Sequence, residues 1–134
     1  MSSTIHADDR EVIAWVENVI VKTFSFSSET TPEDNAEVRK NYTNNAWFGI
    51  TGFFDNYMQI VKEQRLTLHP VINGQTSILE EGGVDKNILP GVEYWRFNIG
   101  LLIPELHLNI DFSIVVINAP TNKYLIQSLD MKLH

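Results

Sequence analysis

The sequence contains no cysteine among its 134 residues. Disulfides and thiolate metal sites are therefore excluded, and the absence of thiols is compatible with any redox compartment. The sequence also lacks an apolar run near the ~20 residues that a membrane-spanning helix needs. Residues 1–10 do not show the basic, apolar and small-residue order of a signal peptide. We therefore expect either a cytosolic protein or a piece whose anchor or export signal lies outside this chain.

Positive charge is scarce as well. Ten Lys and Arg residues face 17 Asp and Glu residues, which gives a net charge of −7 and no basic cluster. A nucleic-acid-binding surface needs positive charge to displace counterions, so we expect no nucleic-acid partner. With 43% hydrophobic residues, the chain is long enough for one core and short for two. We expect a flexible or remnant segment over 1–8 and a single domain over 9–134.

Between Val92 and Asn118 apolar and polar side chains alternate with a period of two. The apolar positions are Trp95, Phe97, Ile99, Leu101 and Ile103, followed after Pro104 and Glu105 by Leu106, Leu108, Ile110, Phe112, Ile114 and Val116. Successive side chains of a strand point to opposite faces, so the two runs predict an antiparallel pair with one apolar and one polar face. The apolar face needs a cover, which we expect from the N-terminal half.

The N-terminal half shows helical spacing. After Asp8 and Asp9, apolar residues from Val12 to Phe24 predict a helix of about four turns that ends near Thr23. Thr31-Pro32-Glu33-Asp34 predicts a second helix start, which we extend to about Tyr42. A third start at Thr43 or Asn44 leads to a helical end near Gln64. Gly49 and Gly52 lower helix propensity there, and could equally let another element approach closely.

From Arg65 the period changes to that of strands. We predict a first strand through Leu66, Leu68 and Val71, a turn at Asn73-Gly74, a short strand at Ile78-Leu79, a loop over 80–91, a turn at 119–122 and a last strand over 125–133. Helices first and about five antiparallel strands afterwards is the α+β pattern. The predicted architecture is a set of N-terminal helices packed on a curved antiparallel sheet.

Few residues in this pattern suggest chemistry. His107 and Asp111, with Asn109 between them, could form an acid–base pair on one strand face. The alternation alone already predicts polar residues at these positions, so we interpret them as a surface. Three tryptophans, Trp15, Trp47 and Trp95, lie on apolar stripes and are expected in the core. The remaining histidines show no metal-ligand spacing, so we expect no catalytic, cofactor or metal site.

Aromatic anchors and turns occur in an order typical of one family. The matching positions are Ala14-Trp15, Phe24-Ser25-Phe26, Tyr42-Thr43, Ala46-Trp47-Phe48, Arg65-Leu66, Glu81-Gly82, Trp95, Leu101-Leu102, Val115-Val116, Ala119-Pro120-Thr121 and Ile126-Gln127. From about Glu11 to Leu129, the chain resembles the periplasmic domain of the DotI/IcmL family. These proteins are inner-membrane components of type IVB (Dot/Icm) secretion and related conjugation systems.

The resemblance implies a cone of the nuclear transport factor 2-like (cystatin-like) kind, similar to the periplasmic domain of the type IVA assembly factor. It also implies an upstream transmembrane helix, ring-like self-association, apparatus subunits as partners and no cofactor. We expect the core anchors to be Trp15, Tyr42, Trp47, Trp95, Phe97 and Phe112. Without a tether, and with a net charge of −7, the isolated domain should be monomeric or weakly associated in dilute solution.

Two classes of function fit this interpretation. The first is a non-enzymatic assembly domain in the periplasm, anchored to the bacterial inner membrane. The second is a small-ligand-binding protein or an enzyme that uses the interior of the cone. Fold alone does not separate the two, because one fold hosts many functions. The discriminating feature is whether the concave face of the sheet is filled or encloses a polar pocket.

Overall fold

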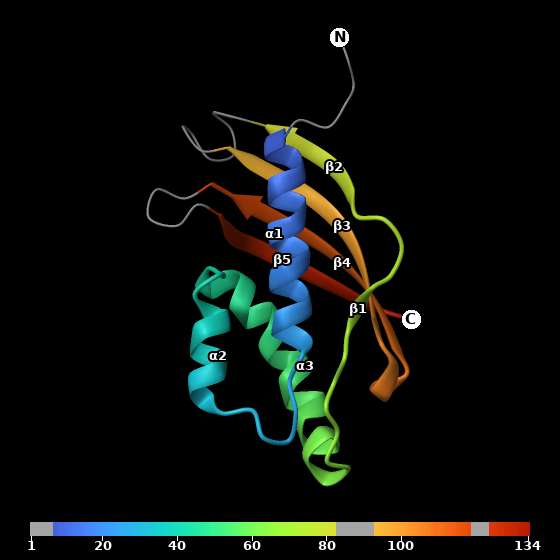
Figure 1. Cartoon of the computed structure of the whole chain (residues 1–134). Coiled ribbons are helices and arrows are strands. Elements are labelled where there is room, and N and C mark those ends of the chain that lie inside the picture. The colour runs from blue at the N-terminus through green and yellow to red at the C-terminus, as the bar shows by residue number, and fades with distance from the viewer. Residues whose placement is uncertain (1–6, 83–92, 119–123) are drawn as a thin grey trace.

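The computed structural model describes residues 7–82, 93–118 and 124–134, which form three helices followed by five strands. The helices are α1 (Ala7–Phe24), α2 (Pro32–Arg39) and α3 (Asn44–Glu63). The strands are β1 (Val71–Ile72), β2 (Ser77–Gly82), β3 (Tyr94–Ile103), β4 (Leu108–Ile117) and β5 (Leu125–Leu133), with a 3-10 turn, η1 (Pro104–Leu106), between β3 and β4. The predicted α+β class is confirmed, and the helices lie against one side of a curved antiparallel sheet (Figure 1).

Side-chain caps set the starts of α2 and α3 where the sequence predicted them. Thr31 accepts a hydrogen bond from the Asp34 amide, while the Asp34 carboxylate accepts one from the Thr31 amide. Thr43 caps α3 by accepting from the Ala46 amide. The predicted end of α2 near Tyr42 is too late, because the helix ends at Arg39. Lys40 and Asn41 form a turn, after which Asn41 and Thr43 hydrogen-bond to Ile126 of β5.

The N-terminal helix differs slightly from its prediction. It begins at Ala7, so Asp8 and Asp9 lie within its first turn rather than at its cap. It ends at Phe24, one residue beyond the predicted end. Carboxylates in the first turn are still favoured by the helix dipole.

The last helix continues through both of its glycines. A side chain at Gly49 would place its Cβ 3.0 Å from the carbonyl oxygen of Leu129, whereas a Cβ at Gly52 would meet nothing within 4 Å. Gly49 therefore lets α3 lie close against the backbone of β5, as the sequence allowed for two glycines. Gly52 has no such contact and leaves open space beside the helix.

The sheet is organised around β3 and β4. Their antiparallel register runs from Tyr94 opposite Ile117 to Ile103 opposite Leu108, which confirms the predicted pair. Strand β5 pairs with the other side of β4, with a bulge near Val115. Strands β1 and β2 both pair with the remaining side of β3.

The prediction for residues 65–74 is wrong in one respect. Leu66 and Leu68 do not start a strand of the sheet, because their backbone groups bond to Ser28 and Phe26 in the loop after α1. The chain does bend at Asn73-Gly74, where Gly74 has a positive φ of 81°, but the bend joins two strands that each pair with β3 rather than with one another.

Contacts at Gly100 explain why β1 and β2 follow one another along β3. The Asn73 amide donates to the Gly100 carbonyl, and a Cβ on Gly100 would lie only 2.5 Å from the Asn73 carbonyl oxygen. The bend thus passes directly over a glycine and continues along the same strand. The predicted loop over 80–91 starts too early, because β2 extends to Gly82. The rest of that loop and the whole predicted turn at 119–122 lie outside the described residues.

Candidate functional site

The concave face of the sheet is filled with side chains. Phe97 and Phe112 are fully buried, and the Phe24 ring of α1 lies 5.4 Å from Phe112 and 4.9 Å from Phe53 of α3. Apolar side chains from two helices and two strands therefore occupy the position where an enzyme of this shape would need an internal polar pocket.

The other expected core anchors surround this centre. Trp95 and Tyr42 are buried, while Trp15 and Trp47 are partly buried and pack against the core. Rings of Trp15 and Trp95 both approach Tyr124, with centroids 5.4 Å and 5.8 Å away. The structure thus places Trp15 of α1 and Trp95 of β3 in one aromatic cluster.

Polar atoms inside the core have partners. The Tyr42 hydroxyl lies 2.6 Å from the Thr23 hydroxyl, and burial raises the pKa of Tyr42 far above its usual value despite this hydrogen bond. The Trp95 indole donates to the Asp9 carboxylate over 3.1 Å. Among the described residues no buried side-chain nitrogen or oxygen lacks a hydrogen bond. These groups satisfy one another, so their polar atoms stabilise the fold.

His107 and Asp111 are not brought together. His107 ends the 3-10 turn before β4 with a positive φ of 52° and is exposed, so it does not lie on the strand face that the alternation predicted. Asp111 lies on β4 facing away from the helices, and its carboxylate is 2.5 Å from the Nε2 atom of His134. No enclosed acid–base pair results.

One histidine–carboxylate pair has no signal in the sequence, because its members are far apart along the chain. Glu105 of η1 accepts from the His69 amide and lies 2.9 Å from His69 Nδ1. Partial burial opposes ionisation of Glu105, but the hydrogen bonds and the nearby His69 ring outweigh it and hold the pKa of Glu105 below its usual value. Since the His69 side chain is 73% exposed, this pair fastens the segment before β1 to the β3–β4 turn rather than forming a pocket.

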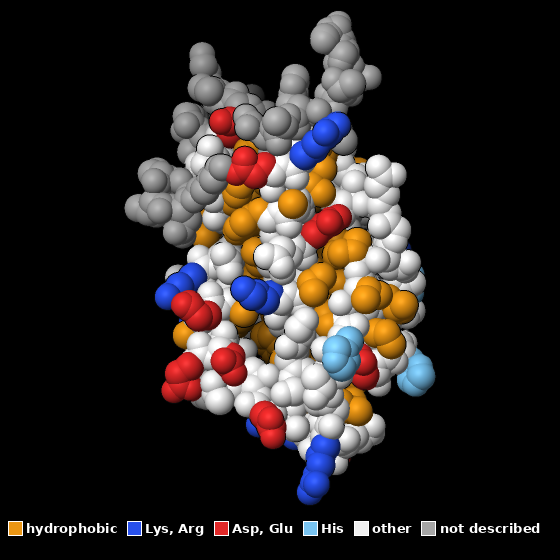
Figure 2. Space-filling model, viewed as in Figure 1, with side chains coloured by type: hydrophobic (Ala, Val, Ile, Leu, Met, Phe, Trp, Pro, Cys, Tyr) orange, Lys and Arg blue, Asp and Glu red, His pale blue; other side chains and the backbone are white. Residues whose placement is uncertain are grey.

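Charge and metal-binding groups are dispersed over the described surface. Acidic and basic side chains are interspersed on the face shown in Figure 2, without a basic patch. Within residues 7–82, 93–118 and 124–134, no group of His, Asp and Glu could hold a metal ion. No helix in these ranges is both long and apolar enough to cross a membrane.

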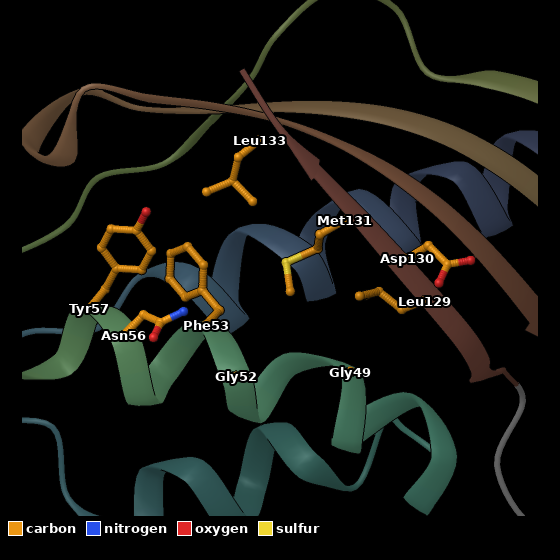
Figure 3. A pocket seen from close by; sticks show the side chains of 9 residues that line it. All are labelled: Gly49, Gly52, Phe53, Asn56, Tyr57, Leu129, Asp130, Met131 and Leu133. Carbon is orange, nitrogen blue, oxygen red and sulfur yellow. The ribbon is translucent and has the colours of Figure 1, made fainter.

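A groove between α3 and β5 is the feature that sequence reasoning missed. It has a volume of about 350 Å³ and is lined by Gly49, Gly52, Phe53, Asn56, Tyr57, Leu129, Asp130, Met131 and Leu133. Met131 and Leu133 point from the strand toward Phe53 and Tyr57 of the helix (Figure 3). Leu133, which lines this groove, is 43% exposed. Apolar surface is therefore open to solvent at this side of the sheet.

The edge of β5 beside this groove is covered over only part of its length. Near its start, the Ile126 amide donates to Asn41, its carbonyl accepts from the Thr43 amide, and the Thr43 hydroxyl donates to Gln127. Beyond Gln127, no other strand pairs with this edge in the described part of the chain. The outer backbone groups at the start of β5 are thus hydrogen-bonded, whereas those nearer its end have no described strand beside them. An edge strand with unpaired backbone groups can pair with another strand.

No protein-family profile and no curated protein sequence matches the chain. Solved structures do match over nearly its full length. The periplasmic domain of DotI (crystal form I) aligns with a TM-score of 0.76 at 16% identity, covering 98% of this chain and 99% of that one. The chain has the fold of the DotI periplasmic domain. The expected DotI/IcmL-like architecture is therefore confirmed at the level of the fold.

Two further structures share this DotI-like fold. A periplasmic fragment of TraM aligns with a TM-score of 0.76 at 11% identity, covering 96% of this chain and 100% of the fragment. An IcmL-like type IV secretion system protein from Legionella pneumophila aligns with a TM-score of 0.65 at 12% identity, covering 97% of this chain and 96% of that one. All three neighbours are described as secretion proteins or as periplasmic pieces, and identities this low establish the shared fold alone.

Proposed function

We propose that this chain is a non-enzymatic, periplasmic assembly component of a type IVB (Dot/Icm-like) secretion or conjugation apparatus. The observation that carries the proposal is the full-length likeness to the DotI periplasmic domain, with a TM-score of 0.76 and coverage of 98% of this chain. The sequence resemblance to the DotI/IcmL family supports the same role. Its partners are other subunits of the apparatus, and an upstream helix anchors the domain to the inner membrane.

The interior of the domain supports a structural role over catalysis. Phe24, Phe97 and Phe112 fill the centre of the concave face, where a ligand-binding relative of this fold would keep a pocket. His107 and Asp111 lie apart, and His107 is exposed. The alternative of a small-ligand-binding protein or an enzyme therefore has no observation in its favour at these positions.

A gene deletion in the source bacterium tests the proposal. Loss of the gene should abolish substrate transfer by the apparatus, and the wild-type gene should restore it. The informative control is a His107→Ala, Asp111→Ala double variant, which should restore transfer fully because neither side chain performs chemistry. Fractionation of the same cells should recover the full-length protein with the inner membrane. Protease added to spheroplasts should digest this domain, because it faces the periplasm. Normal transfer without the gene would refute the assembly role, whereas failure of the double variant would favour catalysis.

A further inference from the structure

The open half of β5 has a sequence that is complementary to itself. Leu129 lies against α3, so the part free for pairing is centred on Asp130, Met131 and Lys132. Reversing the order of these three residues exchanges the acid with the base and leaves Met131 in place. In an antiparallel pair of two such strands centred on Met131, each Asp130 therefore lies opposite the Lys132 of the other copy. Opposite charges at directly paired positions favour this register over its neighbours.

The backbone at the same positions is oriented for pairing. The amide at position 134 donates to the Asn109 carbonyl of β4, and the register then places Asp111 opposite Lys132. Hydrogen-bonded and non-hydrogen-bonded pairs alternate in an antiparallel ladder, so Lys132 and Asp130 bond to β4. Met131 and Leu133 consequently direct their amide and carbonyl groups away from the sheet. Upstream, the carbonyl of Leu129 lies against Gly49, which ends the open stretch.

The side chains divide between two surfaces in a way that suits a second copy. Met131 and Leu133 point into the groove, while Asp130 points away from it (Figure 3). Residues of directly opposed pairs lie on the same face, so the apolar side chains of an incoming β5 would enter the groove of about 350 Å³. Gly52 leaves space there, since no atom lies within 4 Å of a Cβ built on it. The Asp130–Lys132 pairs would form on the opposite, exposed surface.

From these features we infer that a second copy of this chain docks on the open half of β5, with the two strands antiparallel about a two-fold axis at Met131. The Met131 amide of each copy donates to the Met131 carbonyl of the other, which continues the sheet from one molecule into the next. A two-fold contact is closed, so the product is a dimer rather than a filament. The short contact and the net charge of −7 make it weak in dilute solution.

This inference deepens the proposed function by naming one partner, and its biological role rests on that function. Subunits confined to one membrane surface meet at a high effective concentration, where a weak contact suffices. The physical contact does not depend on the apparatus, so it can be measured with the isolated chain. A failure of self-pairing would leave the role in secretion to be decided by the gene deletion alone.

Charge exchange provides the first test. Sedimentation equilibrium up to millimolar concentration should show a monomer–dimer equilibrium for the wild type. Asp130→Lys places Lys opposite Lys, and Lys132→Asp places Asp opposite Asp, so each variant should dimerise roughly 10- to 30-fold more weakly. Mixing the two variants should restore wild-type affinity as a heterodimer. The double variant Asp130→Lys, Lys132→Asp should also recover it.

If association depended only on the net charge, the two variants would behave differently from each other, so the test separates strand pairing from general charge repulsion. Asp130→Lys changes the net charge from −7 to −7 + 2 = −5, which by itself would reduce repulsion and strengthen association. Lys132→Asp changes it to −7 − 2 = −9 and would weaken association. A stronger dimer for Asp130→Lys would therefore contradict the inference. So would a mixture that fails to recover, provided that circular dichroism shows both variants folded.

The absence of cysteine permits a second, positional test. Met131→Cys introduces a single thiol that meets its own copy at the two-fold axis, with Cα atoms ~5.5 Å apart, within disulfide range. Ser128→Cys is the matched control, since the same axis separates its two copies by ~20 Å. Mild oxidation, or a short bis-maleimide, should give a covalent dimer with Met131→Cys and little with Ser128→Cys. Equal cross-linking of both variants, no dimer from Met131→Cys, or a wild type that stays monomeric at millimolar concentration would overturn the inference.

Discussion

The two faces of the central strands β3 and β4 differ in how far their side chains are exposed, although both faces belong to the same backbone. On β3, the helix-facing side chains from Trp95 to Ile103 are buried, whereas Asn98 and Leu102 on the other face are exposed. Cross-strand partners keep this division, since Phe97 lies opposite Ile114 and Asn98 opposite Ser113. The helix-facing surface is buried along the whole of β3, whereas the opposite surface of the two strands is buried only locally, as at Tyr94 and Val115, and its exposed positions should contribute little to the free energy of unfolding.

The largest expected effect comes from truncating an aromatic residue of the helix-facing surface. Trp95→Ala removes a buried ring that contacts Tyr124 and bonds to Asp9, so it should lower the free energy of unfolding by about 3–5 kcal/mol. Urea denaturation monitored by circular dichroism measures the change. Trp95→Phe retains most of the packing and should cost clearly less. A midpoint equal to the wild type for Trp95→Ala would contradict the shared core.

Two adjacent leucines of β3 allow the faces to be compared directly. Leu101 is fully buried and Leu102 is 36% exposed, although they are neighbours in one strand. Leu101→Ala should cost about 2–5 kcal/mol because it leaves a cavity, whereas Leu102→Ala should cost under about 1 kcal/mol. The same denaturation experiment measures both. Equal costs would show that the outer face is more important for packing than its exposure indicates.

A smaller effect should depend on pH. Because the pKa of Glu105 is lowered in the folded state, its ionised form contributes stability above the unfolded pKa of about 4.3, and that contribution is lost as the pH falls through the folded pKa. Glu105→Gln should therefore be less stable than the wild type near pH 6, and the difference should shrink toward pH 3. Thermal unfolding across this range measures it. A difference that is constant with pH would assign the effect to hydrogen bonding alone.

The smallest effects are expected on the outer face and its turn. His107→Ala and Asp111→Ala should each leave the free energy of unfolding within about 0.5 kcal/mol of the wild type, because His107 is exposed and the pair between Asp111 and His134 is near the surface. A loss above 2 kcal/mol for either would mean that the side chain has a buried role. Differential scanning calorimetry is sensitive enough to decide this.

Periodicity was sufficient to predict the parts of the fold where one face meets the core and the other meets solvent. The β3–β4 pair, the capped starts of α2 and α3 and the cover of helices follow from local pattern and capping chemistry. The pairing of β1 and β2 with the same strand, on either side of the Asn73-Gly74 bend, was not predicted because it depends on the close passage of that bend over Gly100 of β3. Local turn preference does not contain that information.

The candidate site shows the same limit. His107 was predicted on a strand face because apolar and polar residues alternate in the sequence through this position. In the structure, the 3-10 turn Pro104–Leu106 interrupts the strand there, so the alternation no longer sets the direction of its side chain. The groove beside β5 was missed because it depends on the distance between α3 and an edge strand that is far away in the chain. The only local feature of the sequence that pointed to this groove was the pair Gly49 and Gly52. Gly49 allows α3 to lie close to β5, whereas Gly52 leaves open space beside the helix.

The cap on the first half of β5 also has a consequence for the order of folding. The Thr43 hydroxyl bonds to Gln127, 84 residues later, so the locally capped start of α3 is tied to the sheet only once the last strand is in place. The ribosome synthesises all three helices before any of the strands against which they pack. Contacts so distant along the chain slow folding, because the connecting loop must close before they contribute. The nascent chain therefore remains without its native core until β5 has been made.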